Sequence, residues 1–127
     1  MQEKELFEYA VIRIVPRVER EEFLNVGVVL FCAKQRFLKA VFDLNPQKLA
    51  AFCVQLDIDE IKNYLAAFEQ ICVAGPGSGP IGKLAKHERF RWLTATRSTV
   101  VQTSKVHPGL CENPEEMLQK LYGNLVL

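Results

Sequence analysis

The stretch Phe23-Leu24-Asn25-Val26-Gly27-Val28-Val29-Leu30-Phe31-Cys32 decides the fold, because it is apolar on both faces of the strand that it predicts. A strand with one face in water alternates apolar and polar residues, and this stretch does not alternate after Asn25. We therefore expect a central strand that is covered on both sides. Gly27 in its middle predicts a bulge or a tight crossing under a neighbouring side chain, with close approach of a ligand as the functional alternative.

Two further strands flank this central strand. Residues 7–15 are rich in β-branched and aromatic residues, and Pro16 ends the run because proline cannot donate to a ladder. Residues 37–42 follow the central strand after the short polar break 33–36, which suits a hairpin. Short connections between successive strands predict an antiparallel meander.

Helices are expected after the meander and at the end of the chain. Asn45-Pro46 and Asn113-Pro114 each combine a capping residue with proline at the first helical position. Asp57 or Asp59 is expected to cap the start of a second helix. Helical spacing of apolar residues gives three stripes: Leu49, Phe52, Cys53 and Leu56; Ile61, Leu65, Phe68 and Cys72; Met117, Leu118, Leu121 and Leu125. The first two helices are expected on one face of the sheet.

Residues 75–111 are the least regular part of the sequence. The glycine-rich stretch 75–82 lacks the Ser or Thr and the preceding strand of a phosphate loop, so we interpret it as a mobile linker. Residues 86–93 would place Arg89 and Arg91 together as a strand and apart as a helix, and their helix-forming composition favours the helix. A turn at 94–98, a strand at 99–103 and a loop at 105–112 follow.

These elements predict an α+β fold. It has a small antiparallel sheet of about four strands, the N-terminal meander plus one late strand, with three to four helices packed mainly on one face. A chain of 127 residues, 49% apolar, suits a single domain spanning 1–127 with its own core. The charged N-terminus is unlike a signal peptide, no apolar run reaches membrane length, and the four cysteines are widely spaced. We therefore expect a cytoplasmic protein with free, mostly buried thiols.

Basic charge is concentrated in residues 74–111, which carry six Lys or Arg against the single acid Glu88, although the net charge of the chain is only +1. Arginine suits anions through its fixed donor fork, so Arg89, Arg91 and Arg97 are candidates for a shared anion site. The alternative is that they pair internally with Glu19, Glu21, Glu22 or Asp43, or lay their stems over apolar surface. The candidate binding residues are Arg89, Arg91, Trp92, Arg97, Ser98 and His107.

No catalytic, cofactor or metal residue is predicted. His107 beside Cys111 suggests a thiol–imidazole pair, but no orienting third group stands at a recognisable spacing. Ser98 as a nucleophile lacks a Gly-x-Ser-x-Gly elbow. A metal site from His87, His107, Cys111 and Glu112 matches no known spacing. Trp92 suits a core or interface anchor better than a platform for nucleic-acid bases.

The stretches Tyr9–Cys32 and Gly79–Cys111, which include Asn-Val-Gly-Val-Val-Leu-Phe-Cys and Glu-Arg-Phe-Arg-Trp-Leu-Thr, resemble the bacterial family known as domain of unknown function 3037. The resemblance implies a small stand-alone cytosolic bacterial protein and brings no reaction, cofactor or catalytic residue. The resemblance also implies that genes of this family often lie beside genes for HipA-like serine/threonine kinases. This association suggests such a kinase as a partner.

Three functions remain in competition. The first is a non-catalytic protein-interaction or regulatory module that uses the basic-aromatic surface of residues 86–111, with a homodimer as one form of it. The second is an anion or nucleic-acid binder using Arg89, Arg91 and Arg97. The third is an enzyme with a site built from Arg97, Ser98 and His107. The chain has few acids or thiols placed for catalysis, which favours the first.

Overall fold

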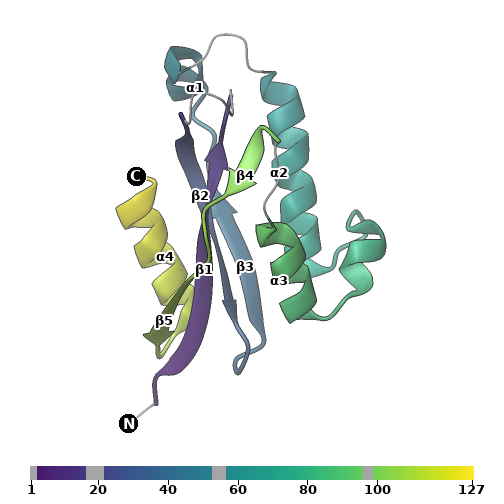
Figure 1. Cartoon of the computed structure of the whole chain (residues 1–127), viewed down its shortest axis with the longest axis vertical. Helices are drawn as coiled ribbons and strands as arrows, with labels where there is room; N and C mark the ends of the chain where they lie inside the picture. Colours follow the sequence, from purple (N-terminus) through teal and green to yellow (C-terminus); the bar gives the residue numbers. More distant parts are fainter. Residues whose placement is uncertain (1–2, 17–21, 53–56, 96–98) are drawn as a thin grey trace.

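The computed structural model describes residues 3–16, 22–52, 57–95 and 99–127 (Figure 1). The strands are β1 (Glu5–Ile14), β2 (Leu24–Cys32), β3 (Phe37–Phe42), β4 (Val101–Thr103) and β5 (His107–Cys111). The helices are α1 (Pro46–Phe52), α2 (Ile58–Val73), the 3₁₀ helix η2 (Gly79–Lys83), α3 (Lys86–Thr94) and α4 (Pro114–Leu125). The fold is α+β, as predicted, and these described ranges contain no helix that is both long and apolar enough to cross a membrane.

The sheet is built on the predicted meander. Strands β1, β2 and β3 pair antiparallel in sequence, and β4 joins the other edge of β1, so the order is β3-β2-β1-β4 with β5 also paired to β1. Every residue of β2 from Val26 to Cys32 is buried. Helices cover both faces of this strand, with α2 and α3 on one side and α4 on the other (Figure 1). The expectation of a central strand covered on both sides is therefore confirmed.

Gly27 has the structural role that the sequence suggested. The register of β1 and β2 shifts between Ile12, opposite Gly27, and Arg13, opposite Asn25, so Val26 is the extra residue of a β-bulge. A Cβ on Gly27 would lie 2.4 Å from the carbonyl oxygen of Val41 on β3. Only glycine lets the two strands approach this closely.

One face of the sheet carries the larger core. Helix α2 lays its predicted stripe, Ile61, Leu65, Phe68 and Cys72, against side chains of all three meander strands, and Leu49 of α1 joins the same cluster. Asp57 caps α2 by accepting the N–H of Glu60 at 3.1 Å. Helix α3 adds Phe90, whose ring stacks on Phe31 with centroids 5.4 Å apart. Cys53 and Leu56, which complete the first predicted stripe, lie outside the described residues.

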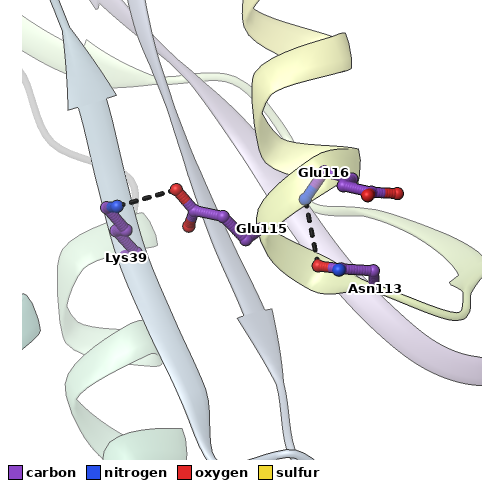
Figure 2. A network of polar contacts seen from close by, with 4 residues as sticks. All are labelled: Lys39, Asn113, Glu115 and Glu116. Atoms are coloured by element: carbon purple, nitrogen blue, oxygen red, sulfur yellow. Dashed lines mark hydrogen bonds and ion pairs between the residues drawn. The ribbon is translucent and has the colours of Figure 1, made fainter.

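Helix α4 covers the opposite face of the sheet. It begins after Asn113, whose side chain accepts the N–H of Glu116, and Pro114 occupies the first turn as predicted (Figure 2). Leu118 is fully buried against Phe7, Val28 and Leu30. The Nζ of Lys39 on β3 lies 2.9 Å from Glu115 of α4, which ties the helix to the sheet edge (Figure 2).

Residues 105–112 were expected as a loop, and this expectation is wrong, because β5 occupies residues 107–111. It pairs antiparallel with β1 over five residues. Proline is tolerated at Pro108 because β5 is an edge strand. The ring of Phe7 lies over Gly109, and a Cβ on this residue would come within 2.5 Å of the ring. Glycine is unfavourable in a strand by itself, but at this position the packing of Phe7 requires it.

Strands β4 and β5 follow one another along the same edge of β1, with a one-residue slip between them. The four residues of β1 from Tyr9 to Ile12 lie opposite the five residues from Thr103 to His107. Ser104 fills this break. Its hydroxyl oxygen accepts the N–H of Val11 at 2.8 Å, and its own N–H donates to the carbonyl of Val11 at 2.8 Å. The buried hydroxyl thus replaces the backbone acceptor that the slip removes.

The interpretation of the glycine-rich stretch 75–82 as a mobile linker is wrong, because this stretch is built into the fold. Helix α2 ends in a Schellman motif, in which Gly75 donates to Gln70 and Ala74 takes the left-handed conformation. The chain then folds back through η2, and Ile81 packs against the larger core. The glycines therefore serve a tight helix-to-helix reversal.

Candidate functional site

Helix α3 carries three of the six predicted binding residues. The predicted preference for helix at residues 86–93 is confirmed. Glu88 in the first turn and Arg91 in the last turn both oppose the partial charges at the ends of the helix. The buried side of α3 consists of Arg89, Phe90 and Leu93.

Arg89 and Arg91 do not share a site. Arg91 is exposed, whereas the side chain of Arg89 is 5% exposed and runs under the end of α2. Its Nη1 donates to the carbonyl oxygens of Ile71 at 3.0 Å and Cys72 at 3.3 Å. Arg89 thus adds a charged donor to carbonyls at the end of α2, where helical donors run out and Ile71 otherwise accepts the N–H of Ala74 at 3.4 Å. Arg97 and Ser98 lie outside the described residues.

Trp92 lies on a groove between α2 and α3. The groove has a volume of about 610 Å³, and its apolar walls come from both helices. Trp92 and Tyr64 are each 39% exposed, whereas Phe68, Ile71 and Leu93 beneath them are buried. Half-exposed aromatic rings beside an apolar floor are the usual anchors of an interface.

Carboxylates line the same groove at the start of α2. Asp57, Asp59 and Glu60 all border it, and none of its described lining residues is basic. Asp57 is committed to capping the helix, but Asp59 and Glu60 are exposed, and neither side chain takes part in an ion pair within the described ranges. The surface around Trp92 is therefore acidic and aromatic on this side.

His107 lies apart from α3, on the edge strand β5. The residue is exposed, and its ring contacts Tyr9 with centroids 5.3 Å apart. Cys111 is four residues further along the same strand, which corresponds to about 13 Å. The imidazole and this thiol are therefore too far apart to form the thiol–imidazole pair considered from the sequence.

The described thiols are buried, and burial disfavours the thiolate of two of them. Cys32, Cys72 and Cys111 are free and buried. Burial raises the pKa of Cys72 from 9.0 to about 12, although the nearby charge of Arg89 lowers it. Burial, with a smaller effect of the adjacent Cys32, also raises the pKa of Cys111. Such thiols are poor nucleophiles. Across the described ranges, no three His, Cys, Asp or Glu side chains are placed to hold a metal.

Sequence reasoning found Trp92 but missed the residues of α2 that face it. Tyr64 falls outside the apolar stripe of α2, and an aromatic residue off the stripe of an amphipathic helix is the signal that could have identified it. Asp59 and Glu60 gave no such signal, because acidic residues are common in the first turn of any helix. Their placement beside Trp92 comes from the packing of α3 on α2.

The comparisons with known proteins address the family of the chain. No curated protein and no solved structure matched the chain. The family model described as a protein of unknown function, DUF3037, matches residues 9–126, a range that includes the meander, the groove helices and α4. The chain therefore belongs to the DUF3037 family.

Proposed function

We propose that this chain is a non-catalytic protein-interaction module of the bacterial cytoplasm, which takes a segment of a partner protein into the groove between α2 and α3. The observation that carries the proposal is the pairing of Trp92 and Tyr64, both half exposed, over a buried apolar floor. A groove of this size accepts a few large side chains.

The charge of the groove defines the partner. Asp59 and Glu60 favour a segment with Lys or Arg next to an apolar anchor. The sequence suggested a basic-aromatic surface over residues 86–111. The proposed surface keeps Trp92 from that range but offers carboxylates to the partner. A HipA-like kinase, suggested by the family resemblance, is the first candidate partner.

Trp92 is the only tryptophan of the chain, so its fluorescence reports directly on the groove. Titration with a tryptophan-free peptide of lysine and leucine should give a saturable change in emission that weakens as salt increases. Asp59→Asn combined with Glu60→Gln should lower the affinity about three- to ten-fold, because it removes the charge and keeps the shape.

Binding to a purified HipA-like kinase should be measured by calorimetry with Tyr64→Ala and Trp92→Ala. Leu110→Ala is the matched control, because Leu110 is exposed and apolar but lies on β5, outside the groove. The proposal fails if the groove variants bind the peptide and the kinase as tightly as Leu110→Ala. Concentration-dependent self-association that the groove variants abolish would identify a second copy of the chain as the occupant and would overturn the basic-partner reading.

A further inference from the structure

The buried guanidinium of Arg89 lacks both a full set of hydrogen-bond acceptors and a carboxylate partner among the described residues. Its Nη1 binds two carbonyls, but its Nε is buried without a hydrogen-bond partner. Within the described ranges, no carboxylate lies within 4.0 Å of the guanidinium, and the ion pair found there joins Lys39 to Glu115. A buried charge without a full partner is costly, and so is an unpaired buried donor.

The end of α2 neutralises only part of this charge. A helix C-terminus carries roughly half a negative charge, and Arg89 brings a full positive one. The thiol of Cys72, whose carbonyl accepts from Arg89, supplies no anion, because burial raises its pKa to about 12. The arginine is therefore left with positive charge and an N–H that the protein does not satisfy.

A pocket opens beside Arg89. Its volume is about 340 Å³, and it is lined by residues of β3, the last turns of α2 and the first turn of α3. Arg36 and Lys86 also line it, and the Nζ of Lys86 donates to the carbonyl of Arg36 across one end. Glu69 is the only acid among the described lining residues. Lys39 also borders the pocket, but its ammonium is held by Glu115 (Figure 2).

We propose that this pocket binds the phosphate group of a small molecule, with Arg89 at its base and Lys86 and Arg36 at its rim. Three cationic residues against one carboxylate leave two positive charges. This balance matches a phosphate group, which carries close to two negative charges near neutral pH, better than a carboxylate with one. The volume leaves room for a small organic substituent beyond the phosphate. This site is separate from the groove at Trp92 and does not depend on the proposed function.

Nitrogen-15 NMR of the full chain tests the site with inorganic phosphate as the probe, against sodium chloride at equal ionic strength. The Nε–H signal of Arg89 should shift and saturate, because the bound anion places negative charge beside the guanidinium. Acetate at the same concentration should shift it far less. No saturable shift with phosphate would overturn the proposal, and an equal response to acetate would overturn its phosphate selectivity.

Rim variants show whether the binding is local to the pocket. Lys86→Ala and Arg36→Ala should each lower the phosphate affinity about three- to ten-fold, because each removes a charged donor from the rim. Lys105→Ala is the matched control, since Lys105 is exposed beyond the opposite edge of the sheet, between β4 and β5. Equal affinities for all three variants would overturn the site.

Discussion

Helix α2 begins among carboxylates and ends against a guanidinium. Asp57, Asp59 and Glu60 stand at its start, and Arg89 reaches the carbonyls of Ile71 and Cys72 at its end. Both arrangements oppose the partial charges of the helix, so helix stability explains one charged group at each end. The remaining charged residues are not explained by helix stability, and they therefore indicate function. They are Asp59 and Glu60 near Trp92, and Lys86 and Arg36 near Arg89.

The largest expected effect comes from removing Arg89. Arg89→Met should lower the free energy of unfolding by about 2–4 kcal/mol, because two buried carbonyls lose a charged donor. Arg91→Met is the matched control on the same helix, and its exposed side chain should change stability by less than about 0.5 kcal/mol. Urea unfolding of both variants makes the measurement. Equal stabilities would show that Arg89 contributes nothing net to the end of α2.

Next to Arg89, Cys72 should make the protein lose stability at alkaline pH. Its pKa is raised from 9.0 to about 12 in the folded chain, so the unfolded state loses this proton first. The stability from this thiol is complete below pH 9 and declines between pH 9 and 12, by up to about 1.4 kcal/mol per pH unit. Urea unfolding of reduced protein across this range should show a shallower decline for Cys72→Ala.

Val28→Ala is the control for that experiment, because Val28 is buried and does not titrate. It should lower the stability by a similar amount at every pH and keep the alkaline slope of the wild type. A Cys72→Ala profile parallel to that of Val28→Ala would contradict the assignment of the slope to this thiol.

Substitutions at the start of α2 should lower the stability less than the loss of Arg89 at its end. Asp57→Ala should cost about 1 kcal/mol of stability, because the N–H of Glu60 loses its capping acceptor. Asp59→Asn should cost only about 0.3 kcal/mol, since it loses an exposed charge near the helix start. Thermal unfolding of the two variants separates the structural acid from the acid available to a partner. A larger loss for Asp59→Asn than for Asp57→Ala would reverse these roles.

The same contrast explains what the sequence could predict. The meander, the stripe of α2 and the caps at Asp57 and Asn113 follow from local patterns, and all are confirmed. β5 was missed because Pro108 and Gly109 are poor strand residues when read alone. Their place in the strand depends on the ring of Phe7, a hundred residues earlier in the chain.

The candidate sites show the same limit. Trp92 could be chosen from the sequence because it is unique, but its acidic surroundings come from α2, about thirty residues earlier. For Arg89 the sequence directed attention to carboxylate partners. The partners in the fold are backbone carbonyls, which every residue carries and no charge pattern reveals. Contacts made by the backbone in tertiary packing are therefore the part that residue types alone do not predict.

The smallest expected effect lies at the residue that ends α2. Ala74 has φ 54° and ψ 42°, the left-handed conformation that favours glycine. Ala74→Gly should therefore raise the free energy of unfolding by about 0.5 kcal/mol, because it relieves the Cβ strain and keeps the Schellman hydrogen bonds. Ala66→Gly makes the same chemical change at an exposed position within α2, where it should lower stability by about 1 kcal/mol. Thermal unfolding of both variants should thus give opposite signs. If both variants lose stability, the left-handed conformation of Ala74 is not strained, and the contacts of Arg89 rather than the geometry of the last turn stabilise the end of α2.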